Sequence, residues 1–253
     1  ALWLAFGPRR AYPRILVLEL AADRPGDIGY LVEMIRPLVG VVTAIGEVPV
    51  HVEYYASPQA VAKEKSKLIQ ALLPRTDSPT ATRDHDRRLL PRDGLAVLNY
   101  DDQTVLDMKN LTKAKVITFG LAHPPTGGPD LWAADIAYFV NDDGQTIGGL
   151  SFKLHQKENF VPMRLNNAIA PYQIYGVLAA AAVALHFGFN LIDIGASLEN
   201  LEMPKGRMNL LHGIKQAIII DDTYNAAPNS THAALDTLRE FAAIVAKLRE
   251  SSQ

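Results

Sequence analysis

Cysteine is absent from this chain of 253 residues, which excludes both a disulfide scaffold and any metal site built from thiolates. No stretch approaches the roughly 20 consecutive apolar residues that a membrane-spanning helix requires, so we expect no membrane span. The formal net charge is only -2, which argues against the broad basic face of a general nucleic-acid-binding protein. With 48% hydrophobic and 21% charged residues, the composition is typical of a globular protein with a sizeable core.

The sequence also lacks the Gly-x-x-x-x-Gly-Lys-[Ser/Thr] loop that holds phosphates in many ATP-using enzymes. Its glycine pairs, Gly127-Gly128 and Gly148-Gly149, are isolated and carry no phosphate-binding signal. There is no initiating methionine, and the first residues are a short apolar run followed by charges, which makes a poor signal peptide. We therefore expect the chain to begin inside a longer protein.

Short apolar runs alternate with longer amphipathic segments along most of the chain, which predicts an α/β fold whose mostly parallel sheet is flanked by helices. Strands are expected at residues 15–20, 39–45, 95–99, 116–119 and 217–220, with others between 136 and 165. Helices are expected at residues 28–36, 60–72, 172–187, 192–200 and 231–248. The second of these is opened by Ser57 as the N-cap and Pro58 at the first position. Residues 76–88 are polar and have no apolar periodicity, so we predict a flexible surface excursion there.

The character of the sequence changes at Pro204-Lys205-Gly206-Arg207, after which only one expected strand and one expected helix remain. One strand and one helix are too few for an independent core. We therefore predict that residues 1–203 form one domain, and that residues 204–253 are the first βα unit of a second domain that is cut short.

Two adjacent carboxylates, Asp221 and Asp222, end the strand expected at residues 217–220, which we interpret as buried. A hydroxyl, an aromatic ring and an amide follow them: Thr223, Tyr224 and Asn225. Ligands of α/β folds bind at strand ends, and paired acids in such a place are costly unless something uses them. The plainer alternative is a strand end followed by a helix N-cap at Ser230.

Four further residues carry side chains that suit a metal ion or a phosphate. Glu19, within the apolar run of residues 15–20, is either a ligand for a hard cation or an edge residue facing solvent. His51 follows the second expected strand by a short loop and is either a metal ligand or structural. Lys65 is one of three lysines on one helix, a pattern that usually marks a solvated face, but their spacing puts them on different faces, so that one of them can point inward. Arg207 lies at the domain junction, either in solvent or against a phosphate.

Six segments of the chain, taken in order, resemble the Mur ligases, a family of ATP-dependent ligases of cell-wall synthesis. They are Val17-Leu18-Glu19-Leu20 with Arg24-Pro25-Gly26-Asp27-Ile28, Pro49-Val50-His51-Val52-Glu53, Val61-Ala62-Lys63-Glu64-Lys65, Leu98-Asn99-Tyr100-Asp101-Asp102, Gly206-Arg207-Met208, and Ile220-Asp221-Asp222-Thr223-Tyr224-Asn225-Ala226. The first four are similar to the family's central, P-loop-NTPase-like ATPase domain. The last two are similar to the start of its Rossmann-like carboxy-terminal domain, in the form found in members that add D-alanyl-D-alanine.

The resemblance implies a cytoplasmic enzyme of peptidoglycan precursor synthesis whose cofactors are ATP and Mg²⁺. In the family, the γ-phosphate passes to a carboxylate of the UDP-muramoyl-peptide to give an acyl phosphate, and an incoming amine then attacks it to form the amide. The partners of this chain would accordingly be a UDP-muramoyl-peptide and D-alanyl-D-alanine. Such chemistry relies on positioning and charge neutralisation, so metal ions and cations dominate the site.

The same resemblance assigns a metal site and its catalytic residues. Glu19 and His51 would hold Mg²⁺. Lys65 matches a lysine that is carbamylated in the family. Carbamylation turns a cation into a carboxylate-like ligand, so Lys65 would join the metal site only once modified.

The resemblance places the nucleotide at the domain junction. Arg207 would contact its phosphates and Asp222 its ribose hydroxyls, while Tyr224 and Asn225 would line the pocket. Gly176 departs from the pattern, because many members carry an adenine-contacting asparagine there, and the family's P-loop and amino-terminal UDP-binding domain are absent from the chain. Two alternatives therefore stay open: a non-catalytic binding or assembly module of Mur-ligase type, and a related amide ligase with another acceptor, as in ligases that act on glutamate or folate.

Overall fold

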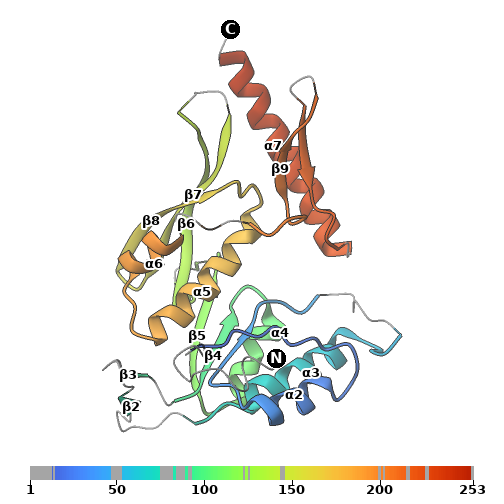
Figure 1. The fold of residues 1–253 in the computed structure, drawn as a ribbon, viewed down its shortest axis with the longest axis vertical. Helices are drawn as coiled ribbons and strands as arrows, with labels where there is room; N and C mark the ends of the chain where they lie inside the picture. The colour runs from blue at the N-terminus through green and yellow to red at the C-terminus, as the bar shows by residue number, and fades with distance from the viewer. Residues whose placement is uncertain are drawn as a thin grey trace.

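A six-stranded sheet forms the body of the molecule, with the strand order β1-β4-β5-β6-β7-β8 (Figure 1). Its strands are β1 (Val39–Val42), β4 (Leu95–Asn99), β5 (Lys115–Gly120), β6 (Leu131–Val140), β7 (Ile147–Gln156) and β8 (Asn159–Asn166). The strands from β1 to β6 run parallel, whereas β6, β7 and β8 pair antiparallel. The prediction of an α/β fold with a mostly parallel sheet is confirmed.

The structure is a computed structural model, and it describes part of the chain. The described residues are 13, 15–46, 53–74, 82–83, 89–90, 93–121, 123–124, 126–142, 146–198, 201, 203–214, 217–225 and 228–251. Among the helices in these ranges, none combines the length and the hydropathy needed to span a bilayer.

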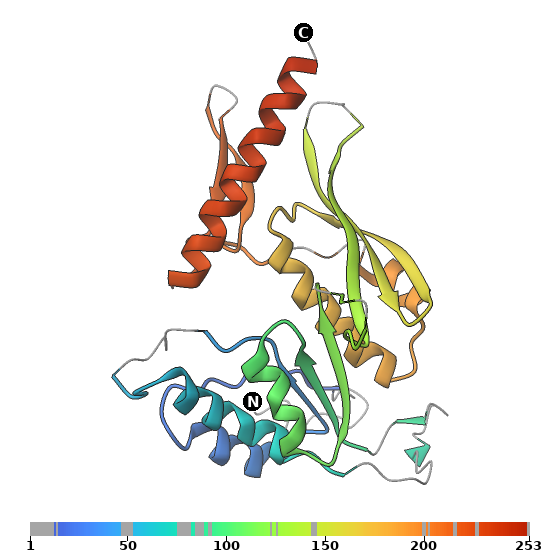
Figure 2. The same ribbon diagram turned by 180° about the vertical axis from the view of Figure 1, so that it is seen from behind.

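Helices cover both faces of the parallel part of the sheet (Figure 1, Figure 2). One face carries α5 (Ile174–His186), which packs on β4 and β5, and the other carries α3 (Pro58–Gln70). Side chains of β4 alternate accordingly, because Leu95 and Val97 belong to the core under α5 and Ala96 and Leu98 to the core under α3. The remaining helices of this body are α2 (Asp27–Ile35), α4 (Gln103–Leu106), α6 (Leu191–Leu198) and the 3-10 helices η2 (Asp107–Leu111) and η3 (Pro171–Gln173).

The helix that carries Lys65 begins where the sequence predicts a start. The Ser57 hydroxyl accepts the backbone N–H of Ala60 at 3.3 Å, and Pro58 occupies the first helical position. The helix predicted at residues 172–187 is also confirmed, as η3 followed by α5, and Gly188 follows it with a left-handed φ of 84°.

The C-terminal part of the chain is a small separate sheet with one helix. Strand β9 (Asn209–His212) pairs antiparallel with β10 (Ile218–Asp221), and α7 (Pro228–Ser251) follows. The expectation of a buried strand is wrong, since Ile218 and Ile219 are 41% and 49% exposed. Strand β9 was not predicted, because Leu210 and Leu211 are too short an apolar run to indicate one.

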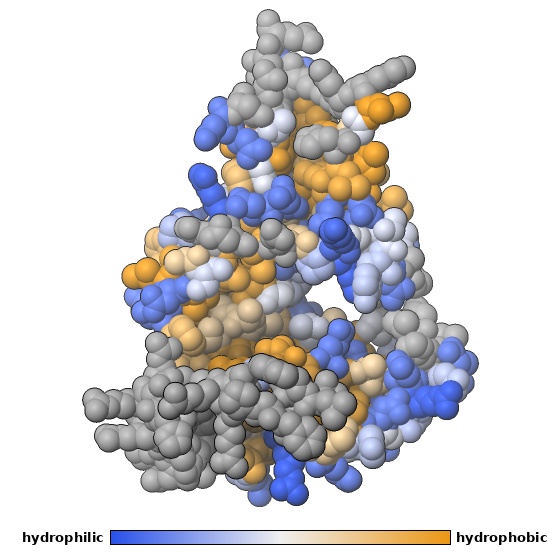
Figure 3. All heavy atoms as spheres, viewed as in Figure 1, coloured by the Kyte–Doolittle hydropathy of each residue, from blue (hydrophilic) through white to orange (hydrophobic). Residues whose placement is uncertain are grey.

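Hydrophobic side chains gather over this hairpin in the upper part of Figure 3. Besides the two isoleucines of β10, Leu211 and Ile214 are 46% and 85% exposed. The hairpin therefore lacks a cover on one face within the described structure. Its other contacts run through a cluster in which Met208 and Phe241 are buried with Ile147, Ile169 and Ala170 of the main body.

Residues 15–20 are extended but belong to no sheet in the described structure, so the strand predicted there is wrong. Val17 is 90% exposed, and Leu16 is 58% exposed. A cavity lies between this segment and β1, whose paired neighbour among the described residues is β4 alone. A strand needs a hydrogen-bonded partner, and an apolar run by itself does not supply one.

The polar excursion of residues 76–88 lies mostly outside the described residues. Within and beside it, β2 (Thr82–Arg83) pairs antiparallel with β3 (Leu89–Leu90). The excursion therefore contains a short strand, which its polar composition did not predict.

Candidate functional site

A cavity of about 640 Å³ brings two of the predicted site residues together. Residues 15–20 and β1 line it along its length, and Glu19 and Lys65 are both in its wall. Glu19 comes from the extended segment and Lys65 from α3, so two elements that are distant in sequence meet here. Most of the other lining side chains are aliphatic, which makes these two charged groups the distinctive chemical feature of the cavity.

Lys65 is a partly buried lysine between two carboxylates. Burial lowers the pKa of Lys65, while the charges of Asp102 and Glu19 raise it, and burial prevails. A lowered pKa increases the fraction of neutral amine, which is the form that reacts as a nucleophile. The side chain therefore differs from a solvated surface lysine, which was the plainer interpretation of its charge run.

Asp102 and Asn99 hold the loop that leaves β1. Asp102 accepts the backbone N–H of Ile45 at 2.7 Å and that of Val105, in the first turn of α4, at 3.1 Å. The Asn99 amide donates to the backbone oxygen of Thr43 at 2.8 Å. The carboxyl ends of β1 and β4 are thus fastened to each other beside Lys65, at the edge of a parallel sheet where ligands bind.

Asp101 connects the same edge to α5. Its Oδ2 accepts the Tyr175 hydroxyl at 2.8 Å and the backbone N–H of Leu121 at 2.6 Å. A Cβ on Gly120, the last residue of β5, would lie 2.8 Å from Asp101 Oδ1, so only glycine allows this approach. Tyr175 precedes Gly176. In the described part of the chain, no heavy atom from beyond the neighbouring residues and backbone of its own helix lies within 4 Å of the place where a Cβ of Gly176 would stand.

The junction between the main body and the C-terminal part contains Arg207. Its guanidinium carbon lies 4.1 Å from the centroid of the Tyr224 ring. The Tyr224 N–H donates to the backbone oxygen of Gly206 at 3.1 Å, and Gly206 has a left-handed φ of 72°. Asp222 accepts the backbone N–H of Met208 at 3.2 Å. The loop after β10 is therefore tied to the Gly206-Arg207 turn by its backbone and its side chains.

Sequence reasoning missed two residues at this junction, Tyr172 and Gln173. The Gln173 amide donates to the backbone oxygen of Arg207 at 3.2 Å and accepts the N–H groups of Ile169 and Ala170. Burial, together with the charge of Asp222, raises the pKa of Tyr172 to about 12, and the charge of Arg207 opposes this rise. Their position directly before an alanine-rich helix was the available signal, since a helix N-terminus is a common place for ligand contacts.

The predicted site residues thus fall into two groups along one edge. Glu19 and Lys65 lie at the cavity, and Arg207, Asp222 and Tyr224 lie at the junction. Asp101, Tyr175 and Gln173 provide the contacts that join the intervening strands to α5 and to Arg207. Asn225 is exposed in the loop after β10.

His51 lies outside the described residues, so its predicted place beside Glu19 stays a prediction. Within the described ranges, no group of three His, Cys, Asp or Glu residues stands close enough to hold a metal ion. A metal site of the predicted kind would therefore need the modified Lys65, His51 or a phosphate to complete its ligands.

Comparison with known proteins shows a similarity to one family. Residues 6–86 match the family model described as "Mur ligase middle domain". These residues are therefore similar to a Mur ligase middle domain. The match includes Glu19, His51 and Lys65 in one segment.

Relatives that match beyond this segment extend the similarity over most of the chain. The UDP-N-acetylmuramoyl-tripeptide--D-alanyl-D-alanine ligase of Mycobacterium leprae is 28% identical over 231 residues, which is 88% of this chain and 40% of that protein. A crystal structure of MurF from Acinetobacter baumannii has a TM-score of 0.68 and 27% identity, and covers 88% of this chain and 42% of that one. The Thermotoga maritima MurF structure in complex with ADP has a TM-score of 0.67 at 23% identity, covering 90% and 45%. The chain thus spans less than half the length of the relatives it matches.

Proposed function

We propose that this chain is part of an ATP-dependent amide ligase that adds D-alanyl-D-alanine to a UDP-muramoyl-tripeptide in the cytoplasm. The observation that carries the proposal is the cavity that Glu19 and Lys65 share. These two residues belong to the first and the third of the segments that resemble the Mur ligases. The names of the M. leprae relative and of the A. baumannii structure support this acceptor. Residues 1–203 would form the central domain and residues 204–253 the start of the carboxy-terminal domain.

The residues around the cavity fit a hard divalent cation. Glu19 supplies a carboxylate oxygen, the ligand that Mg²⁺ prefers, and Mg²⁺ sites in nucleotide enzymes leave most positions to phosphates and water. Lys65 fits only as a carbamate, and burial favours the neutral amine that carbamylation requires. Glu19, Lys65 and His51 would hold the ion, which when bound neutralises charge on the phosphate that is transferred.

The nucleotide would lie across the junction. Arg207 presents N–H groups to its phosphates, and stacking on Tyr224 keeps the guanidinium in place. Asp222 would accept ribose hydroxyls through Oδ2, because its Oδ1 accepts the backbone N–H of Met208. The Tyr172 hydroxyl, whose pKa is about 12, is protonated at neutral pH. Tyr224 and Asn225 line the pocket.

Phosphate release by the full-length protein tests the proposal. With ATP, Mg²⁺, UDP-muramoyl-tripeptide and D-alanyl-D-alanine, we expect release that depends on both the tripeptide and the dipeptide. Glu19→Ala and Lys65→Ala should reduce the rate at least roughly tenfold, and the exposed neighbours Glu33→Ala and Lys63→Ala serve as controls. No release with any of the acceptors would support the non-catalytic module, and release with glutamate instead would support the related ligase.

A further inference from the structure

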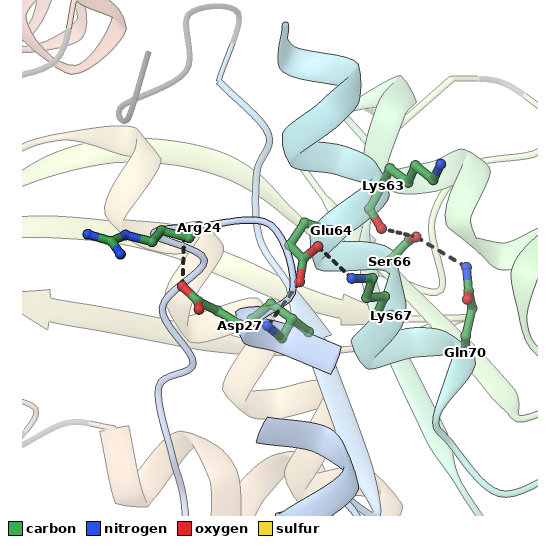
Figure 4. Close-up of polar contacts among 8 residues, drawn as sticks. Arg24, Asp27, Lys63, Glu64, Ser66, Lys67 and Gln70 are labelled. Carbon is green, nitrogen blue, oxygen red and sulfur yellow. Dashed lines mark hydrogen bonds and ion pairs between the residues drawn. The ribbon is translucent and has the colours of Figure 1, made fainter. Parts of the chain in front are cut away.

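Glu64 is a buried carboxylate that the proposed chemistry does not use. It stands on α3 directly before Lys65 and is 4% exposed. Its two oxygens have different partners, since Oε2 lies 2.7 Å from Lys67 Nζ and Oε1 accepts the backbone N–H of Ile28 at 3.0 Å (Figure 4). A buried charge of this kind is costly unless it is paired and hydrogen-bonded. Lys67 supplies the ion pair, and the Ile28 N–H supplies a hydrogen bond from a different helix.

The contact with Ile28 caps a helix that has no cap of its own. The N-cap residue of α2 is Gly26, which has a left-handed φ of 106° and no side chain to accept a first-turn N–H. Helices leave their first N–H groups without partners, and a negative charge is favourable at that end. Glu64 supplies both the acceptor and the charge, but from α3, which lies 36 residues further along the chain.

This cap anchors the segment that carries Glu19. Residues 15–22 belong to no sheet in the described structure, and most of their side chains are exposed, so few contacts fix their position. The segment runs into the turn at Arg24, whose N–H donates to Asp27 at 2.7 Å, and then into α2 (Figure 4). Holding the first turn of α2 against α3 therefore anchors the carboxyl end of the segment that carries Glu19 to the helix that carries Lys65.

We propose that Glu64 is a positioning residue for the metal site, which sets the separation of Glu19 and Lys65 by capping α2 from α3. Glu64 touches neither the ion nor the nucleotide. The inference rests on the proposed function only in naming the ion. The cap itself is a property of the fold.

Three variants of the full-length protein separate this role from general stability. Glu64→Leu removes the acceptor and the charge, Glu64→Gln keeps an acceptor oxygen for Ile28, and Lys67→Met removes the ion pair but leaves the cap. We expect Mn²⁺, used as a probe for Mg²⁺, to bind Glu64→Leu about tenfold to a hundredfold more weakly in the presence of ATP, as for other residues that orient metal ligands. Glu64→Gln and Lys67→Met should stay within about threefold of wild type.

Hydrogen exchange at the Ile28 amide gives a second readout that needs no turnover. We expect faster exchange in Glu64→Leu and near-wild-type exchange in Lys67→Met. Unchanged Mn²⁺ affinity in Glu64→Leu, or an equal loss in Lys67→Met, would overturn the proposal. Mn²⁺ affinity and hydrogen exchange can be measured even if the wild-type protein releases no phosphate. The absence of phosphate release would count against the proposed ligase activity and not against the role of Glu64.

Discussion

The guanidinium of Arg207 lies over the aromatic face of Tyr224, with its carbon 4.1 Å from the ring centroid. Such a cation–π contact is worth roughly 0.5–1 kcal/mol at an exposed site, and Tyr224 is 68% exposed. The same two segments are joined by the hydrogen bond from the Tyr224 N–H to Gly206. These contacts therefore fix the orientation of the Arg207 guanidinium, which we propose binds the nucleotide phosphates.

Arg207→Lys should raise the KM for ATP about tenfold in the full-length protein, because lysine neither stacks in the same way nor binds a phosphate through two N–H groups. Steady-state phosphate release at varied ATP measures the change. Lys205→Met, an exposed cation two residues away, is the matched control. An unchanged KM in Arg207→Lys beside a raised KM in Lys205→Met would show that only the net charge near the junction matters.

Gly176→Asn should be accommodated without loss of stability. In the described part of the chain, no heavy atom from beyond the neighbouring residues and helix backbone lies within 4 Å of the added Cβ, and asparagine has a helix propensity a few tenths of a kcal/mol better than glycine. If the adenine lies beside α5, where many members of the similar family carry an adenine-contacting asparagine, the new amide should lower the KM for ATP. The KM for ATP and the melting temperature are measured together. A lower melting temperature would mean that the space is filled in solution.

Asp102→Ala should destabilise the protein by about 1–2 kcal/mol, because it removes an N-cap and leaves the Ile45 N–H without its acceptor. Urea denaturation measures the change. Asp107→Ala, which removes only an exposed bond to Gln103, should stay within about 0.5 kcal/mol of wild type. Equal effects would contradict the role given to Asp102 at the end of β1.

Phe241→Ala should destabilise the contact between α7 and the main body by about 3–5 kcal/mol. Phe241 is 3% exposed and packs edge-on against Tyr138 at 6.0 Å between centroids. Hydrogen exchange should quicken in α7, β9 and β10. Leu238→Ala, on a 48% exposed side chain of the same helix, is expected to change little. Unaltered exchange in Phe241→Ala would show that the helix is held by other contacts.

His155→Phe should make stability less dependent on pH. Burial lowers the pKa of His155 below 6.5, Lys153 and His123 lower it further, and Asp135 opposes them. The unfolded chain therefore takes up the proton first, so wild-type stability is full above about pH 6.5 and is lost as the pH falls through the folded-state pKa. Phenylalanine keeps the aromatic contact with Trp132 but does not titrate.

Melting temperatures between about pH 7.5 and pH 5 measure this slope. The variant should retain a smaller decline, because burial also lowers the pKa of His186. Identical slopes in variant and wild type would remove His155 as a contributor.

Much of the fold followed from local signals in the sequence. Ser57 and Pro58 marked the start of α3, and the apolar run of residues 95–99 marked β4. The errors arose where a strand depends on its neighbours. Residues 15–20 had the composition of a strand but not a partner, and β10 was read as buried although its hairpin is covered on one face only.

The candidate site was predictable in its residue types but not in its connections. Glu19, Lys65 and Arg207 stood out because a charge followed or interrupted an apolar segment. Gln173 and Glu64 did not, because their significance lies in contacts with Arg207 and Ile28, which are 34 and 36 residues away. Long-range pairs of this kind leave no local pattern.

The cluster around Met208 and Phe241 links the stability of the two parts of the chain that meet near residue 204. Side chains on both sides of that boundary share one core, since Ile147, Ile169 and Ala170 are buried with them. The unit of β9, β10 and α7, too small to fold alone, takes its stability from the main body. The two sides of the boundary differ in sequence character, but they should unfold together as one cooperative unit. A ligand bound at the Gly206-Arg207 turn would therefore stabilise both sides against unfolding.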